Sequence, residues 1–312
     1  MTVRSYPTRA ARVTYIALAI LAAVALSVQF ACASSPYEVV DGVGNTVRLE
    51  RVPERIVSVA VSGTEILFSL IDHERIVGVT SFDTDESMSN VAELAREVDN
   101  IIDFNSESVI ALNPDLVVVA PWNNPDVVNQ IKQTGIPVYV MADIVEISQI
   151  PQNIVALGQA VGAVAEATAL AKELEAKLQE LDALAASATF MPRVLIYTTW
   201  GSTYGRGTTY DELIRRCNAI NVADELGIVG WGNVSEENII ATDPDFIVFD
   251  FYGEPDQSVI TDCCSSPKFS GLSAVVNGRV LSVDQKHMTT TSQFIVKGFE
   301  DLLSILHPEL LE

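Results

Sequence analysis

Two glutamates in matching positions of a repeated stretch are the first residues whose placement suggests chemistry. The stretch ESVIALNPDLVVV begins at Glu107, and ENIIATDPDFIVF begins at Glu237, 130 residues later. Each copy predicts a short helix capped by Asn105 or Ser235, a Pro-Asp turn and a buried strand. An acid in a first helical turn complements the helix dipole, so a stabilising role is one interpretation. The repeat also predicts two similar α/β lobes on which the two carboxylates take equivalent places.

Tryptophans form a second group of candidate functional residues. Trp122, Trp200 and Trp231 fall just past, or between, the ends of predicted strands. In a doubly wound sheet the loops at these ends form the ligand crevice, and aromatic walls suit a large flat or amphipathic ligand. Packing in the core is the alternative for each of them. We expect all three to line a cleft.

Histidines are few and widely spaced in the chain. There are three, His73, His287 and His307, whereas a receptor for bare zinc or manganese needs several histidines and carboxylates that converge. His73 is expected in a surface turn and His307 at a helix end, which leaves His287 as the one expected at the cleft. The inventory favours a metal chelate over a bare ion as ligand, with no intrinsic metal site or cofactor.

The first 33 residues are typical of an export signal. Arg4, Arg9 and Arg12 precede an apolar run over 15–28, and small residues surround Cys32. The run is shorter than the roughly 20 residues that a membrane-spanning helix needs. Ordinary cleavage and lipidation of Cys32 both fit; a cysteine directly after the apolar run favours the lipoprotein. The protein is therefore expected outside the cytoplasm, with a lipid anchor as its only contact with the membrane.

The chain is strongly acidic beyond this leader. Three of the 19 basic residues precede Cys32, so the rest carries 16 basic against 41 acidic residues, a net charge of −25. Such a surface disfavours nucleic acid and anionic lipid headgroups as partners and favours docking onto a basic protein surface.

Three further cysteines, Cys217, Cys263 and Cys264, lie in the second half of the chain. In an oxidising compartment they indicate one disulfide and one leftover thiol. We expect Cys217 to pair with Cys263 or Cys264, and the sequence leaves the choice open.

The order of predicted elements indicates an α/β fold with two Rossmann-like lobes. Apolar strands alternate with helices, which means parallel sheets covered on both faces. Between the lobes, the segment 152–188 is rich in Ala, Leu, Glu and Lys at helical spacing. Gly158 and Gly162 are expected to split it and to leave one long helix over about 165–187. The predicted division is 37–160 for the first lobe, 163–188 for the connecting helix and 190–312 for the second lobe.

Four features in order carry a resemblance to a known family. They are VPERIVSVAVSGTEILFSL from Val52, the two repeat copies, the helix over 165–187, and AVVNGRVLSVD followed by TTTSQFIVKGFEDLLSILHPEL. Together they resemble the substrate-binding proteins of metal-chelate ABC importers, the iron-siderophore, cobalamin and haem group with a helical backbone between the lobes. The resemblance covers essentially the whole chain after the leader. It implies a monomeric binding protein of the helical-backbone class rather than an enzyme.

The resemblance also implies roles for particular residues. In this family one surface glutamate on each lobe docks into arginine pockets of the permease dimer, which here would be Glu107 and Glu237. Glu65, in SGTEIL, matches a signature residue that we interpret as structural. The segment WGNVSEE resembles vitamin B12-binding members, which keep a tryptophan of the cleft at the position of Trp231; Trp122 matches another such tryptophan with an offset of two residues. The remaining residues expected at the cleft are Phe82, Tyr204, Arg206 and Tyr252.

The ligand stays open among three chelates, with cobalamin slightly ahead of a hydroxamate siderophore and haem third. A single candidate arginine, Arg206, disfavours multiply charged catecholates. Haem would need an axial ligand, for which Tyr204, Tyr252 and His287 are the candidates. The alternative functions are a surface hydrolase and a sensor or adhesion module. The sequence lacks G-x-S-x-G, a P-loop and G-x-G-x-x-G after a strand, which disfavours an enzyme.

Overall fold

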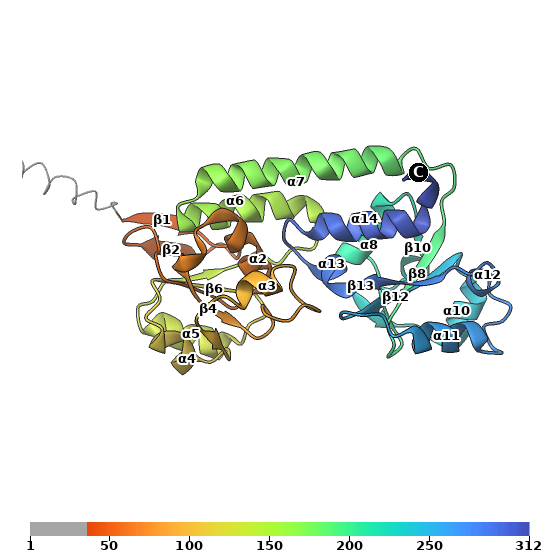
Figure 1. Cartoon of the computed structure of the whole chain (residues 1–312), viewed down its shortest axis with the longest axis horizontal. Coiled ribbons are helices and arrows are strands. Elements are labelled where there is room, and N and C mark those ends of the chain that lie inside the picture. The colour runs from red at the N-terminus through yellow and green to blue at the C-terminus, as the bar shows by residue number, and fades with distance from the viewer. Residues whose placement is uncertain (1–35, 312) are drawn as a thin grey trace, which may run out of the picture.

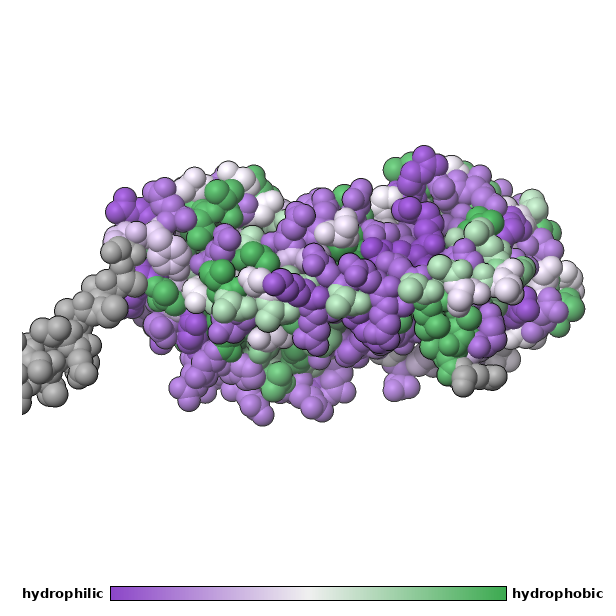
Figure 2. Space-filling view, turned by 90° about the horizontal axis from the view of Figure 1, so that it is seen from above, coloured by the Kyte–Doolittle hydropathy of each residue, from purple (hydrophilic) through white to green (hydrophobic). Residues whose placement is uncertain are grey.

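Two α/β lobes lie side by side beneath a long helix in the computed structural model (Figure 1), which describes residues 36–311. The predicted export signal over 1–33, Cys32 included, lies outside the described residues. Within 36–311 none of the helices has the length and apolar character needed to cross a bilayer. Seen from above, onto the long helix, the surface is mostly hydrophilic (Figure 2).

The first lobe is built on a parallel sheet with the strand order β5-β4-β3-β6-β7. The strands are apolar because helices cover both faces; all four residues of β6 are buried. An antiparallel hairpin, β1 (Tyr37–Val40) with β2 (Thr46–Leu49), precedes the sheet. The sheet strands are β3 (Ile56–Ser58), β4 (Ile76–Thr80), β5 (Ile101–Ile102), β6 (Leu116–Val119) and β7 (Val138–Val140), and the helices are α2 (Val61–Leu70), α3 (Ala92–Ala95), α4 (Ser106–Ala111), α5 (Pro125–Gln133) and α6 (Ile150–Val161).

The second lobe repeats this plan with a four-stranded parallel sheet in the order β10-β8-β12-β13. A two-stranded antiparallel ribbon, β9 (Ser202–Tyr204) with β11 (Trp231–Asn233), stands beside it. The sheet strands are β8 (Arg193–Tyr197), β10 (Ile220–Asn221), β12 (Phe246–Phe251) and β13 (Val280–Asp284). The helices are α8 (Thr209–Arg216), α9 (Val222–Glu225), α10 (Glu236–Thr242), α11 (Gln257–Ser265), α12 (Ser273–Val276), α13 (Gln285–Thr289) and α14 (Ile295–Leu306).

A single helix, α7 (Val164–Ala185), runs along both lobes (Figure 1). Only Gly162 of the two expected glycines interrupts the segment: it ends α6 with φ +74°, a left-handed conformation that glycine adopts without strain. Gly158 lies inside α6, which corrects its expected role. A Cβ at Gly158 would lie 2.2 Å from that of Ala167 on α7, so this glycine lets the two helices pack closely.

One apolar core continues through both lobes under α7. It contains Val118 of the first sheet, Leu178 of α7, Val248 of the second sheet and Leu302 of α14. Each sheet has a smaller apolar cluster on its other face. Because the lobes share one core, the division into 37–160, 163–188 and 190–312 stays a prediction.

The carboxylate of Glu65 joins the lobes by hydrogen bonds. Glu65, on α2, is completely buried. Its Oε1 accepts from the backbone N–H and the side-chain Nδ2 of Asn90, each at 2.8 Å. Its Oε2 accepts from the hydroxyls of Thr290 and Ser292 in the second lobe, each at 2.6 Å. The structural role expected for Glu65 is confirmed, and it extends to the contact between the lobes.

Replacing Glu65 with alanine should lower the free energy of unfolding by about 3 kcal/mol, because the buried Thr290 and Ser292 hydroxyls lose a charged acceptor. Urea denaturation of the ligand-free protein measures the change. As a control, Glu166→Ala removes an exposed acid from the first turn of α7 and should change stability by less than about 0.5 kcal/mol. Equal stability of the two variants would show that the Glu65 carboxylate does not hold the lobes together.

Candidate ligand-binding cleft

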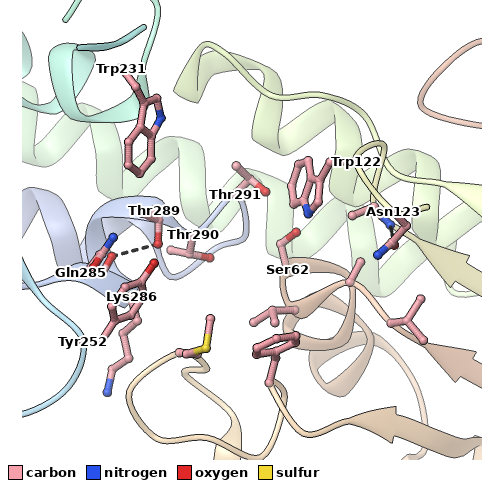
Figure 3. Close-up of a pocket in the computed structure, with 16 residues that line it drawn as sticks. Ser62, Trp122, Asn123, Trp231, Tyr252, Gln285, Lys286, Thr289, Thr290 and Thr291 are labelled. Carbon is pink, nitrogen blue, oxygen red and sulfur yellow. Dashed lines mark hydrogen bonds between the residues drawn. The ribbon is translucent and has the colours of Figure 1, made fainter. Parts of the chain in front are cut away.

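A cleft opens between the lobes at the carboxyl ends of the parallel strands, where doubly wound sheets bind ligands. The first lobe contributes the segments after β3, β4 and β6, and the second contributes β11, the segment after β12, and α13. Its volume is about 400 Å³, within a recess of about 1100 Å³ that includes open solvent. Figure 3 shows the side chains that face it.

Two tryptophans from different lobes stand on opposite sides of the cleft (Figure 3). Trp122 follows β6 and is 70 % exposed, while Trp231 begins β11 and is 59 % exposed. Asn123 fixes the turn that carries Trp122, since its Oδ1 accepts from the Ala120 N–H at 2.7 Å. Phe82 and Tyr252 also line the cleft. The structure thus brings together four of the aromatic residues expected there.

A buried cluster of two tyrosines and an aspartate supports Trp231 from behind. The Trp231 ring meets the ring of Tyr204 edge-on, with centroids 4.6 Å apart, and Tyr204 stacks on Tyr210 at 3.7 Å. Both phenols donate to Asp250 Oδ2, at 2.5 and 3.0 Å. Burial raises the pKa of the Asp250 carboxyl, against the hydrogen bonds from the two phenols. Tyr204 is buried and is not among the residues that line the cleft, so its expected place there was wrong.

Three more residues expected at the cleft lie outside it. Trp200 is 59 % exposed but belongs to the turn between β8 and β9 and does not line the cleft. Arg206 forms an ion pair with Asp224 at 2.6 Å. The Nδ1 of His287 contacts Asp301 Oδ2 on α14 at 2.6 Å. These three expectations were wrong because a place after a strand does not fix the direction of a side chain.

The sequence did not identify the polar residues of the cleft. Gln285, Lys286 and Thr289 come from α13, directly after β13. The ammonium group of Lys286 crosses between the lobes: Nζ donates to the Glu86 carbonyl at 2.8 Å and pairs with Asp284 at 3.2 Å. Their position at a strand end was the available signal. Among the described residues that line the cleft, Lys286 is the one charged side chain.

The two repeat glutamates occupy equivalent places outside the cleft. Each is the second residue of its helix, α4 or α10, and each is exposed. Asn105 and Ser235 cap these helices as expected, accepting from the N–H three residues on. Both helices lie on the side of the molecule away from α7 (Figure 1). Hydrogen bonds from its own backbone and from the Ser235 hydroxyl, with Lys268 nearby, lower the pKa of Glu237.

The expected disulfide is absent among the described cysteines. Cys217, Cys263 and Cys264 are all free thiols. The core shared by the lobes contains Cys217, whereas Cys263 belongs to the cluster on the other face of the second sheet, so the sheet separates the two. Burial raises the pKa of both thiols, that of Cys263 to about 11. The count of cysteines alone could not show this separation.

A group of three or more His, Cys, Asp and Glu side chains placed to hold a metal ion does not occur within residues 36–311. The groups that line the cleft are instead aromatic rings, hydroxyls, two amides and one ammonium, together with aliphatic side chains. This set suits a large ligand that stacks and accepts or donates a few hydrogen bonds.

The chain is similar to known binding proteins in sequence and in fold. A family model described as "Periplasmic binding protein" matches residues 56–287. The chain is 27 % identical to an uncharacterised ABC transporter substrate-binding lipoprotein of Bacillus subtilis, over 88 % of this chain and 86 % of that protein. It is 24 % identical to a cobalamin-binding protein of Halobacterium salinarum, over 88 % and 75 % of the two chains. Among solved structures, the periplasmic haem-binding protein RhuT of Roseiflexus superposes with a TM-score of 0.72 at 26 % identity, over 82 % and 99 % of the two chains.

In the native protein a maleimide should label Cys264 and leave Cys217 and Cys263 unmodified, because these two thiols are buried and have raised pKa values. Unfolding without a reductant should make all three reactive. Peptide mapping without reduction identifies which cysteines carry the maleimide and whether any are joined in a disulfide. A disulfide-linked peptide that contains Cys217 would contradict the structure.

Proposed function

We propose that this chain, which belongs to the periplasmic binding protein family, is the substrate-binding protein of an ABC importer for a metal chelate, with cobalamin first among the ligands. The match over residues 56–287 and the curated relatives support the transport role. The role is one of binding and delivery, and we assign no residue to catalysis. In this proposal the protein is a monomer, and it docks onto its permease through the exposed acids Glu107 and Glu237, one on each lobe.

The observation that carries the ligand class is the pair of tryptophans across the cleft. Trp122 and Trp231 expose large aromatic faces from different lobes toward one cavity. Leaving such surface in water is unfavourable, and a flat macrocycle would cover both rings at once. The polar groups around them fit a ligand of low net charge.

Cobalamin ranks ahead of haem because the cleft offers a poor axial ligand for ferric iron. His287 is turned to Asp301, and Tyr204 is buried in the core. Tyr252 lines the cleft, but burial and the Asp250 charge raise its pKa, which disfavours the phenolate. Haem remains the alternative, favoured by the likeness to the haem-binding protein of Roseiflexus. A hydroxamate siderophore would use the same aromatic walls.

The expectations about the leader remain part of this proposal. Residues 1–33 would direct export, and Cys32 would carry the lipid anchor. The curated relative of Bacillus subtilis is named a lipoprotein, which supports the lipoprotein over ordinary cleavage. Detection of a lipid-modified Cys32 peptide by mass spectrometry tests this assignment.

The ligand is identified by native mass spectrometry after incubation with cobalamin, haem and a ferric hydroxamate siderophore. We expect a one-to-one complex with cobalamin and quenching of tryptophan fluorescence by the bound corrin. Binding of haem alone would remove cobalamin from first place. Failure of all three chelates would overturn the proposed ligand class.

Trp231→Ala should weaken cobalamin binding by about 2 kcal/mol, roughly 30-fold, because a large aromatic contact with the ligand is lost. Trp200→Ala is a matched control: the two side chains are equally exposed, at 59 %, but Trp200 lies outside the cleft. It should leave affinity within twofold of the wild type. Isothermal titration calorimetry measures both variants. Equal losses in the two would show that the effect does not come from the cleft.

Replacing both Glu107 and Glu237 with alanine should abolish stimulation of the cognate importer's ATPase and leave ligand affinity within a factor of a few. The two carboxylates are exposed and equivalent on the two lobes, and neither lines the cleft. The double variant Glu166→Ala and Glu173→Ala removes the same charge from α7, on the other side of the molecule (Figure 1). Proteoliposome assays should show normal stimulation with this control, and normal stimulation by the first pair would exclude the docking role.

A further inference from the structure

Gln285 is a buried amide with no partner at the edge of the cleft. It opens α13 directly after β13, and its side chain lines the cleft beside Tyr252 and Lys286 (Figure 3). The residue is only 1 % exposed. Within the described part of the chain, neither its Nε2 nor its Oε1 has a hydrogen-bond partner.

An amide in this state is costly for the ligand-free protein. Most buried polar side-chain atoms in folded proteins have a partner, and an unmade bond costs the desolvation of the group. The Tyr252 phenol lies near the amide. Burial raises the pKa of this phenol, and the Gln285 amide lowers it by a smaller amount. No hydrogen bond of ordinary geometry joins the two side chains. The Thr289 hydroxyl donates to the Gln285 backbone carbonyl at 2.9 Å and makes no hydrogen bond with the side-chain amide.

The chemistry of the free amide specifies its complement. Nε2 offers donors and Oε1 offers an acceptor, so a group that both accepts and donates at one edge satisfies it fully. A primary carboxamide is such a group. A carboxylate provides acceptors only; it would leave Oε1 unpaired and place two oxygens against each other. The one charged neighbour in the lining, Lys286, is already held by Asp284 and the Glu86 carbonyl.

We propose that Gln285 is a specificity-determining residue that recognises a peripheral carboxamide of the bound chelate through a pair of reciprocal hydrogen bonds. The inference rests on the proposed function and narrows it: a corrin carries primary carboxamides around its ring, whereas haem carries carboxylates. The aromatic walls hold the face of the macrocycle, and Gln285 selects among chelates by the group at its edge. A site built to pair with a polar group rejects analogues that lack it.

The test compares Gln285→Met with the wild type by calorimetry, using cobinamide and a corrin whose side-chain amides are hydrolysed to carboxylates. Methionine keeps the length of the side chain and removes both polar atoms. We expect cobinamide affinity to fall about tenfold, and the preference for the amide over the acid to shrink by a similar factor. The melting temperature of the ligand-free variant should stay equal or rise, because an unpaired buried amide is gone. A residue needed only for folding would give the opposite pattern.

A matched control removes another buried amide. Asn153 has an unpartnered Nδ2 and does not line the cleft. Asn153→Leu should leave both the corrin affinity and the preference for amides within twofold of the wild type. If Gln285→Met does not fold, Gln285→Leu serves in its place: it also removes both polar atoms and should reduce the preference for amides by a similar factor.

The two levels of the proposal fail in different ways. If the wild type binds cobinamide and Gln285→Met keeps the same affinity and the same preference for amides, the role of Gln285 is overturned and the chelate-binding function stands. If the wild type binds no corrin, cobalamin is overturned as the proposed ligand, and the recognition of its carboxamides by Gln285 is overturned with it. A lower preference in the Asn153→Leu control would also overturn the assignment to Gln285.

Discussion

The buried carboxylate of Glu65 is the interaction on which the arrangement of the two lobes depends. It accepts from Asn90 in the first lobe and from Thr290 and Ser292 in the second. Burying a carboxyl group is costly unless its oxygens are hydrogen-bonded, so separating the two lobes here would leave Glu65 without its partners in the second lobe. Below α7 the shared apolar core opposes the same separation. The lobes therefore meet in a defined orientation, which fixes the relative positions of the cleft residues that each lobe contributes.

The cleft wall is rigid for a related reason. Trp231 is exposed, but it packs against Tyr204, which stacks on Tyr210, and Asp250 accepts from both phenols. Trp231 is therefore placed by buried groups that never face the ligand. A preoriented aromatic surface loses little conformational entropy on binding, which favours affinity without new contacts. The cleft pairs this fixed wall with polar groups from α13.

Much of the fold followed from the sequence, because the strands, the repeat and the caps are local signals. The two helices of the repeat and the end of α6 at Gly162 could be predicted from neighbouring residues alone. The cleft was harder. Trp122 and Trp231 line the cleft from the strand ends where they were predicted, and Phe82 and Tyr252 line it as well. Tyr204, Arg206 and His287 instead pair with Asp250, Asp224 and Asp301. Gln285 also follows a strand, but the sequence does not show that its amide lacks a partner. The predicted disulfide was wrong because the second sheet separates Cys217 from Cys263, and the sequence does not show this separation.

The distribution of charge separates the two tasks of the surface. Most of the 41 acids serve outside the cleft, where they keep the protein soluble and present Glu107 and Glu237 on exposed helix starts. Inside the cleft a negative ligand would meet the field of the whole acidic chain with one engaged lysine to offset it. A chelate of low net charge avoids that repulsion and draws its binding free energy from ring stacking and from hydrogen bonds to neutral groups. The aromatic pair, the unpaired amide and the excess of acid thus point to the same kind of ligand.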